Sequence, residues 1–389
     1  MSKRRAALYP LYLSIILVLL IGSLSGCADQ QAVPATSTPV TDSTPTRAPV
    51  TDSIPTPAND EVATRDVVDM AGRKVTVPRE IKKVFTTHAV GYIFLYTLDP
   101  SRIIGSNTNL TQTEKKYLLP ELRDLPNLGG WGATVNANTE EILRIHPDLI
   151  ISMEGMDATR VSLADKIQEQ LGIPVLMLDN SLDKLPETYE LMGDLLGIKA
   201  RAQELASYTA QTVKEAKEKA NQIPEQKRVR VYYAEGSKGL ETDPKGSQHV
   251  EVLDLVGGIN VAEVGQGEKG VMGRTPVSLE QVLAWNPEVI ISWNAQQGGY
   301  FPDMVSDPGW QAIKAVSTGR VYGIPNVPFS WFDRPPSSNR LLGIKWLGNL
   351  LYPEVFTNNV SADVKEFFKE FYHYDLSDNE VDALLQTQP

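Results

Sequence analysis

Charged, aromatic and hydroxyl side chains meet in one short string near the carboxyl end of the chain. Residues 330–340 read Ser-Trp-Phe-Asp-Arg-Pro-Pro-Ser-Ser-Asn-Arg, and an apolar helical pattern with Leu341, Leu342 and Trp346 follows. Proline fits the first turn of a helix, whose unpaired backbone N–H groups attract anions. The guanidinium of Arg334 and the serine hydroxyls would strengthen an anion contact here. The alternative is that the serines cap the helix and Arg334 makes a structural ion pair.

Further candidate ligand contacts follow other predicted strands. In open parallel sheets, ligands bind beyond the carboxyl ends of the strands, so the loops after each strand should form the site. The tryptophans among them would stack on a flat chelate, or one or two of them would pack in the core instead. The candidate ligand-binding residues are His88, Tyr92, Trp131, Arg274, Trp293, Asn326, Trp331 and Arg334.

The histidines and the cysteine argue against a resident metal and against catalysis. The chain has four His and one Cys, and only His88 directly follows a predicted strand. A bare zinc or manganese site needs several ligands that converge on one point. The sequence also lacks a phosphate-binding glycine loop, a nucleophile elbow and a plausible nucleophile–base pair. We therefore expect no enzyme, no metal site and no cofactor, with a chelatase-like enzyme as the less favoured alternative.

The amino terminus predicts export and lipid attachment. Positive residues at positions 3–5 precede an apolar run, and residues 24–27 read Leu-Ser-Gly-Cys, which is typical of a signal peptide that ends in a lipobox. Cys27 would then be the lipid-bearing first residue, which anchors the protein without a spanning helix. The alternative is a retained membrane helix. The formal charge of −11 argues against nucleic acid as a partner.

Composition changes along the chain divide it into segments. Residues 28–61 are rich in proline and threonine and too poor in large apolar residues to fold, which predicts an extended tether. Apolar runs alternate with amphipathic helices after it, as in parallel α/β layers. A helical pattern at residues 199–222 lies between two such regions. We predict a signal peptide at 1–26, the lipidated cysteine and linker at 27–61, an N-terminal lobe at 62–196, a linking helix at 197–224 and a C-terminal lobe at 225–389.

The two predicted lobes contain one shared pattern. Residues 140–152 align with residues 280–292 at a constant offset of 140, and Glu, Leu, Pro, Ile, Ile and Ser coincide. Each copy predicts a short helix that ends before a proline, followed by a strand buried on both faces. The lobes are therefore expected to be related units.

Taken together, these marks resemble a known family, the substrate-binding lipoproteins of ABC importers for ferric complexes, haem and cobalamin. The resemblance spans about residues 64–375 and includes the Gly129-Gly-Trp-Gly132 segment, the Gly257-Gly-Ile-Asn260 turn and the two Pro-Asp/Glu-(Leu/Val)-Ile-Ile units. The string at 330–340 is similar to a branch that includes molybdate and tungstate receptors. The resemblance implies two Rossmann-like lobes joined by one long helix, with the ligand between them.

The resemblance also implies the partners and the cargo. Glu140 and Glu280 occupy equivalent positions in the two copies and match glutamates that dock onto the permease dimer of such importers; Glu141 is a possible substitute for Glu140. The alternative is that both only favour the first turn of their helices. An iron(III) complex of siderophore or haem type is the favoured cargo, and a molybdate or tungstate oxyanion is the alternative. A monomer in the periplasm or on the outer face of the cytoplasmic membrane is expected.

Overall fold

The computed structural model describes residues 63–131, 136–264 and 274–386. The chain divides into two compact units, and the unit Asp60–Pro389 contains all of these residues. The predicted signal peptide, Cys27 and the linker lie outside them. Among the helices that the structure describes, none combines the length and the apolar character that a membrane crossing requires.

The N-terminal lobe is built on a parallel sheet preceded by a hairpin. Its strands lie in the order β3-β4-β5, and Ile103 makes one further parallel bridge to Val84 on the free side of β3. The strands of this lobe are β1 (Thr64–Val68), β2 (Lys74–Pro78), β3 (Val84–Thr86), β4 (Leu149–Ser152) and β5 (Val175–Met177). Its helices are α1 (Ala89–Leu98), α2 (Gln112–Lys116), α3 (Thr139–Ile145), α4 (Ala158–Leu171) and α5 (Leu185–Leu196).

The C-terminal lobe repeats this sheet. Its parallel strands lie in the order β11-β10-β6-β8, and a two-stranded ribbon of β7 and β9 stands beside them. Its strands are β6 (Arg230–Ala234), β7 (Glu241–Thr242), β8 (Ile259–Asn260), β9 (Thr275–Pro276), β10 (Val289–Ser292) and β11 (Val321–Gly323). Its helices are α7 (Glu251–Leu255), α8 (Leu279–Trp285), α9 (Asp303–Ser306), α10 (Lys314–Ser317), α11 (Arg340–Leu351), α12 (Val360–Tyr372) and α13 (Asp378–Leu384). These parallel sheets confirm the predicted α/β class.

The shared sequence pattern folds twice into the same structure. Both bounds of α3 and of β4 recur in α8 and β10 with the offset of 140 that the sequence shows. Asn138 and Ser278 cap the two helices by accepting the amide protons of Glu141 and Gln281. Each helix ends on a left-handed residue, at φ 54° and φ 44° respectively. The predicted relation between the lobes is therefore present down to the helix caps.

A basic side chain at the start of the first strand clamps this unit in both lobes. Lys83 Nζ donates to the Ile145 carbonyl at 3.0 Å, and Arg230 Nη2 donates to the Trp285 carbonyl at 2.8 Å. Both carbonyls belong to the last turn of their helix, where a cation is favourable because the helix dipole is negative. The same chemistry thus fixes the helix against the sheet in each lobe.

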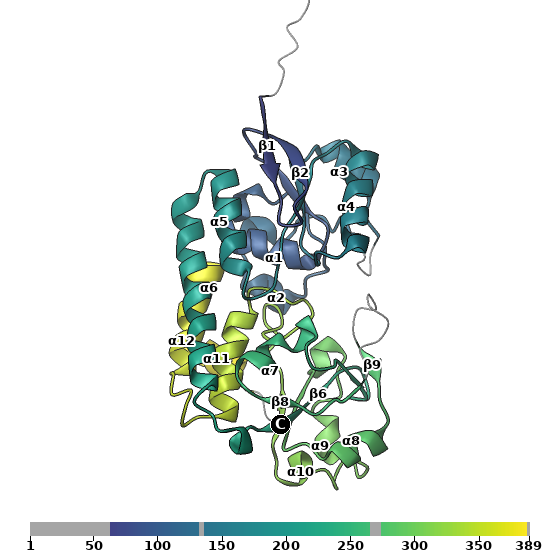
Figure 1. Ribbon diagram of the computed structural model, residues 1–389, viewed down its shortest axis with the longest axis vertical. Coiled ribbons are helices and arrows are strands. Elements are labelled where there is room, and N and C mark those ends of the chain that lie inside the picture. The colour runs from purple at the N-terminus through teal and green to yellow at the C-terminus, as the bar shows by residue number, and fades with distance from the viewer. Residues whose placement is uncertain (1–62, 132–135, 265–273, 387–389) are drawn as a thin grey trace, which may run out of the picture. The chain divides into compact units, whose positions relative to one another are not determined.

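The linking helix is α6 (Lys199–Ala220), which falls within the predicted range. It forms a hairpin with α5, and the two helices approach closely at Gly193, where an added Cβ would lie 2.2 Å from the Ala202 Cβ. Helices α11 and α12 lie beside α6 (Figure 1). One apolar core cluster runs from the strands of the first lobe through these helices to the strands of the second.

The C-terminal helices join the two lobes in addition to α6. Tyr96, on α1, donates from its hydroxyl to the Tyr372 carbonyl at 3.2 Å, and the two rings lie 5.5 Å apart. Lys116 forms an ion pair with Glu380 at 2.6 Å. The last part of the predicted C-terminal lobe therefore packs on the first lobe, which limits how far the lobes can move relative to each other.

Candidate functional site

The loops after β3 and β4 in the N-terminal lobe, and after β6 and β10 in the C-terminal lobe, define the candidate site. In the N-terminal lobe, Thr86 of β3 lies opposite Ile151 of β4, and in the C-terminal lobe Ala234 of β6 lies opposite Ser292 of β10. From β3 the chain first goes to Ile103 on one side and then to β4 on the other side. From β6 it likewise goes first to β8 and then to β10 on the opposite side. The carboxyl ends of the first and third strands are the point where such sheets bind ligands.

The start of α1 presents free backbone donors at this point in the N-terminal lobe. His88 is the N-cap residue, with extended backbone, but its side chain does not cap the helix. The first intrahelical bond runs from the Tyr92 amide to the His88 carbonyl, and in the part of the chain that the structure covers the amides of residues 89–91 have no acceptor. An uncapped helix start of this kind attracts a negative charge.

Two predicted ligand contacts next to these amides carry polar atoms without partners. His88 Nδ1 and the Tyr92 hydroxyl are both buried, and neither has a hydrogen-bond partner among the residues described. Burial, assisted by the charge of Arg160, lowers the pKa of His88, so its imidazole is neutral near pH 7. Burial also raises the pKa of Tyr92. Unsatisfied buried polar atoms are rare in folded proteins and call for a functional explanation.

Glu154 and Arg160 complete this edge of the lobe. Arg160 Nη1 lies 2.9 Å from Glu154 Oε2, and the Thr87 hydroxyl lies 3.4 Å from Glu154 Oε1. Burial raises the pKa of Glu154, while Arg160 and Thr87 oppose the shift. The sequence reasoning missed this pair. Glu154 follows β4 by two residues, so the rule that selected His88 after β3 would also have found it.

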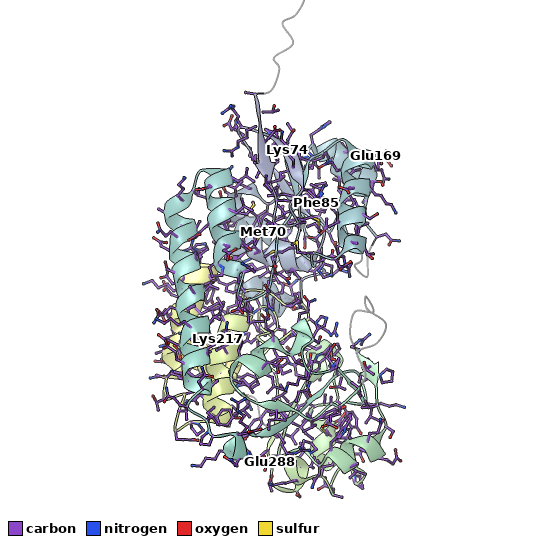
Figure 2. All side chains as sticks on the ribbon, in the orientation of Figure 1. Met70, Lys74, Phe85, Glu169, Lys217 and Glu288 are labelled. Carbon is purple, nitrogen blue, oxygen red and sulfur yellow. The ribbon has the colours of Figure 1, made fainter. Side chains whose placement is uncertain are left out.

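Trp131 reaches the same edge through a tight backbone contact. Its amide donates to the Thr87 carbonyl at 3.0 Å, and an added Cβ at Gly130 would lie 2.1 Å from that carbonyl oxygen. Trp131 stands edge-on to Phe85, with ring centroids 6.5 Å apart, and remains partly exposed. Figure 2 labels Phe85 within the N-terminal lobe. Trp131 is therefore placed where a ligand at the start of α1 would meet it.

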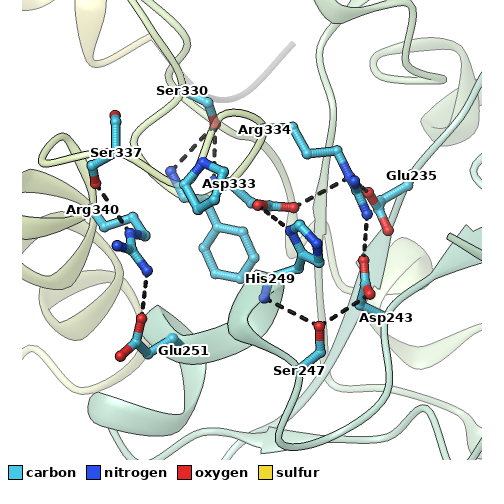
Figure 3. Close-up of polar contacts among 12 residues, drawn as sticks. Glu235, Asp243, Ser247, His249, Glu251, Ser330, Asp333, Arg334, Ser337 and Arg340 are labelled. Carbon is cyan, nitrogen blue, oxygen red and sulfur yellow. Dashed lines mark hydrogen bonds and ion pairs between the residues drawn. The ribbon is translucent and has the colours of Figure 1, made fainter. Parts of the chain in front are cut away.

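In the C-terminal lobe, Arg334 is surrounded by carboxylates (Figure 3). Its Nε lies 2.6 Å from Glu235 Oε1 and 3.3 Å from Asp333 Oδ2, and its Nη2 lies 2.7 Å from Asp243 Oδ2. Burial opposes the charge of Arg334, but Asp333 and Glu235 outweigh it and raise its pKa. These contacts match the structural ion pair that the sequence left open as the alternative to an anion contact, and they leave little positive potential for an added anion.

Glu235 is the most perturbed carboxyl of this cluster. Its side chain is fully buried, and Oε2 has no hydrogen-bond partner within the described ranges. Burial raises its pKa to about 9; Arg334 lowers it and Asp243 raises it further. The short contact to Arg334 is an ion pair by geometry, but the carbonyl oxygen of a neutral acid also accepts from a guanidinium, although more weakly than a carboxylate does. We take Glu235 to be protonated near pH 7, because one guanidinium cannot neutralise three buried carboxylates.

The same cluster contains a set of metal-ligating groups. One ligand atom each from Asp243, His249 and Asp333 lies within 4.8 Å of the others, and all three residues are buried. This donor set suits a divalent ion. Arg334 nevertheless binds both carboxylates, and His249 Nδ1 lies 2.6 Å from Asp333 Oδ1, so the positive charge at this point is the guanidinium. The sequence did not predict this grouping, because among the histidines only His88 directly follows a predicted strand.

Three other predicted contacts lie apart from the Arg334 cluster or at its margin. Arg274 is exposed, lies 3.3 Å from Glu241, and has its guanidinium 5.6 Å from the Trp293 ring. Trp293 is 9% exposed and donates from Nε1 to the Tyr233 hydroxyl at 2.8 Å. Asn326 lines a separate cavity of about 300 Å³ next to α13. The structure therefore brings Arg274 and Trp293 together but not Asn326.

One expectation for residues 330–340 needs correction, and another stays a prediction. Trp331 has no exposed surface, and its Nε1 donates to the Val327 carbonyl, so in this structure it packs in the core and offers no face for stacking. The following helix begins at Arg340, and its first amides donate to carbonyls of residues 337–339. The amides of Ser337 and Ser338, just before this helix, have no acceptor among the described residues, so an anion contact at this segment stays a prediction.

The two glutamates proposed for docking take equivalent places. Glu140 and Glu280 are both exposed and occupy the second position of α3 and α8. Two like charges on repeated helices suit a partner with two equivalent basic sites.

Comparison with known proteins gives consistent matches. A family model described as periplasmic binding protein matches residues 95–328. An ABC transporter solute binding protein from Sulfurospirillum deleyianum has 31% sequence identity and a TM-score of 0.76, with 83% of this chain and 99% of that chain covered. The molybdate-binding protein MolA of Haemophilus influenzae is 25% identical over 80% of this chain and 92% of its own length. YvrC of Bacillus subtilis, an uncharacterized ABC transporter substrate-binding lipoprotein, is 22% identical over 76% of this chain and 88% of its own length.

Proposed function

Because the chain belongs to the periplasmic binding protein family, we propose that it is the substrate-binding lipoprotein of an ABC importer with a molybdate-type oxyanion as cargo. Cys27 is proposed to carry the lipid, which places the protein in the periplasm or on the outer face of the cytoplasmic membrane. The protein captures and delivers its cargo and does not transform it.

The uncapped start of α1 is the observation that carries the oxyanion proposal. The amides of residues 89–91 point out of the helix start at the carboxyl edge of the sheet, without acceptors of their own among the described residues. A tetrahedral dianion offers several acceptor oxygens and is stabilised by the positive end of the helix dipole. The relative that binds molybdate matches this chain over most of its length, which supports the same choice.

The aromatic residues favour a small ligand over a large chelate. A wide chelate needs several exposed ring faces in its site. Trp331 is completely buried and Trp293 is 9% exposed, so of the three candidate tryptophans only Trp131 offers an accessible ring. The order of the two cargo classes that the sequence favoured is therefore reversed in this proposal.

An iron(III) complex remains the second candidate because of one observation. The neutral imidazole of His88 has a ring nitrogen without a partner, and a neutral imidazole is the form that binds metals. A chelate with an open coordination position would use that nitrogen. Its binding would then depend on the His88 side chain and not on the helix amides.

Delivery is proposed to use the exposed glutamates Glu140 and Glu280, which would contact basic sites on a permease dimer that works with an ATPase. The protein is proposed to act as a monomer, with one copy of the repeated unit on each half of the permease.

A single backbone change tests the oxyanion proposal. Ala89 is the first residue of α1, and the extended backbone of His88 tolerates a following proline, so Ala89→Pro removes one donor and keeps the helix. Gln112→Pro makes the same change at the first residue of α2, where the side chain is exposed, and serves as the control. Isothermal titration calorimetry would use the chain from Ala28 onwards, which retains the whole compact unit.

We expect molybdate and tungstate to bind this chain, with an affinity about tenfold lower for Ala89→Pro and unchanged for Gln112→Pro. Binding of ferric siderophores or haem alone, lost in His88→Ala and kept in Ala89→Pro, would replace the oxyanion with the second candidate. Oxyanion binding that is equal in all variants would contradict the role of the helix start.

A further inference from the structure

A second cavity lies at the opposite edge of the N-terminal lobe from the candidate cargo site. It has a volume of about 640 Å³, and Ile81 and Lys82, which line it, lie three and two positions before the start of β3. Its floor is apolar, with Ile81, Leu195 and Leu196 buried. The cavity is therefore at the amino ends of the strands and cannot be part of a site at their carboxyl ends.

The charge of this cavity is opposite to that of the whole chain. Arg65, Arg79, Lys82 and Arg102 line it, together with only two acidic residues, Glu80 and Asp194, whereas the chain has a net charge of −11.

The acidic residues leave two of the arginines without a counter-charge. Glu80 pairs with Lys82 at 2.9 Å, and Asp194 pairs with Lys199 outside the cavity at 2.8 Å. Neither Arg65 nor Arg79 has a carboxylate partner in the described part of the chain. Two guanidinium groups therefore face the same cavity with their charge uncompensated.

Arg65 and Arg102 are held in place at the wall of the cavity. Arg65 donates from Nη2 to the Leu195 carbonyl, and Arg102 donates from Nη2 to the Leu196 carbonyl at 3.1 Å, so both cap the end of α5. The Nε of Arg65 is buried and finds no acceptor among the described residues. A buried guanidinium donor without an acceptor is costly, so an anion that accepts from it would be stabilised.

We infer that this cavity binds a phosphate-type anion through Arg65 and Arg79. Guanidinium groups bind phosphate oxygens in pairs of parallel hydrogen bonds, and a cavity of this size accommodates a phosphoester or a lipid headgroup. The Arg79 amide donates to the Ala63 carbonyl at 2.8 Å, so the cavity adjoins the point where the segment from Cys27 enters the lobe. The inference does not depend on which cargo the protein binds. Only a lipid headgroup as the source of the phosphate group depends on the proposed lipid anchor at Cys27.

Charge reversal at one exposed position tests the inference. Arg79→Glu changes an exposed side chain that forms no hydrogen bond or ion pair within the described residues, and Lys166→Glu, on α4, makes the same charge change at another exposed side chain of the same lobe. Arg65→Gln is the second variant. Pyrophosphate binding to the chain from Ala28 onwards would be measured by calorimetry. Flotation with phosphatidylglycerol vesicles, compared with phosphatidylcholine vesicles, would test the lipid source.

We expect Arg79→Glu and Arg65→Gln to weaken pyrophosphate binding at least about tenfold, with Lys166→Glu unchanged. Loss of flotation in the same two variants identifies a lipid headgroup as a source, and flotation that never occurs assigns the cavity to soluble phosphoesters. Pyrophosphate binding that survives both variants but is lost in Ala89→Pro belongs to the cargo site and overturns the inference. Absence of pyrophosphate and vesicle binding in the unmodified chain also overturns it, whatever happens with molybdate.

Discussion

Arg340, the first residue of α11, donates a hydrogen bond to the backbone carbonyl of Asn180, 160 residues earlier in the chain. The Asn180 side chain returns a hydrogen bond to the Pro336 carbonyl at 3.2 Å, and Glu251 accepts from both Arg340 and the Leu182 amide. These contacts join the segment after β5 to the segment before α11. A buried polar network therefore fixes the two lobes to each other next to the apolar contacts.

Arg340→Met tests this network. Arg340 is 1% exposed, and its loss removes the cationic partner of Glu251 and the side-chain donor to the Asn180 carbonyl. We expect the free energy of unfolding to fall by about 3–5 kcal/mol, because the remaining buried charge is uncompensated. Urea denaturation measures the change. Arg144→Met, which removes an exposed pair with Glu141, should cost at most about 1 kcal/mol; equal costs for the two variants would contradict a role of the network.

Glu235 predicts a pH dependence of stability. Its pKa is about 9 in the folded protein against 4.5 for an ordinary glutamate, so between these values the folded state binds the proton and the unfolded state does not. The contribution of Glu235 is fully present below pH 4.5 and is lost as the pH rises toward 9. Glu235→Gln keeps the neutral shape, so its melting temperature should exceed that of the unmodified chain by a margin that grows with pH. Thermal denaturation at several pH values checks this, with exposed Glu225→Gln as the control; a margin independent of pH would show that Glu235 is ionised.

The different burial of Trp331 and Trp131 predicts that the same substitution lowers stability at one position and ligand affinity at the other. Trp331→Leu removes part of a fully buried side chain and should lower the free energy of unfolding by about 3 kcal/mol, with molybdate affinity unchanged. Trp131 is partly exposed beside the candidate site, so Trp131→Leu should weaken ligand binding with a smaller loss of stability. Denaturation and calorimetry on both variants separate the roles. A loss of affinity confined to Trp331→Leu would reverse the assignment.

Glu140 and Glu280 predict a transport defect without a binding defect. Both side chains are exposed, and neither forms a hydrogen bond or ion pair with a candidate ligand contact within the described residues, so Glu140→Arg with Glu280→Arg should leave cargo affinity intact. Repulsion from basic sites on the permease should lower cargo-dependent ATP hydrolysis by the reconstituted importer at least about tenfold. Glu218→Arg with Glu225→Arg carries the same charge change elsewhere. An equal defect in both double variants would indicate a general charge effect.

The architecture was predictable because it rests on repeated local signals. The offset of 140 between the two copies, the proline after each helix and the continuous apolar strands identify the same unit twice, and the structure keeps all three. Helix α6 was predictable from its apolar period. Each helix and strand signal depends on residues close in sequence, and the repeat is found by comparing the chain with itself, so one sequence is sufficient.

The candidate site was less predictable because it depends on which side chains other residues have already engaged. Arg334 is an attractive anion ligand in the sequence, but Glu235 and Asp243, about 100 and 91 positions away, occupy it. Trp331 and Trp131 are both candidate ligand contacts in the sequence. Only the fold shows that the first is buried and the second is partly exposed. The free amides of α1 have no residue-type signal except the lack of a capping side chain before them.

The apolar core that continues from one lobe through α6, α11 and α12 into the other has a thermodynamic consequence. Strands of both lobes lose packing partners when either lobe opens, so neither can melt by itself without exposing the interior of the other. A calorimetric scan should therefore show one cooperative transition with equal van't Hoff and calorimetric enthalpies. The lobes are alike in design but are not interchangeable modules, and half of the chain expressed alone would expose an unmatched apolar surface and aggregate.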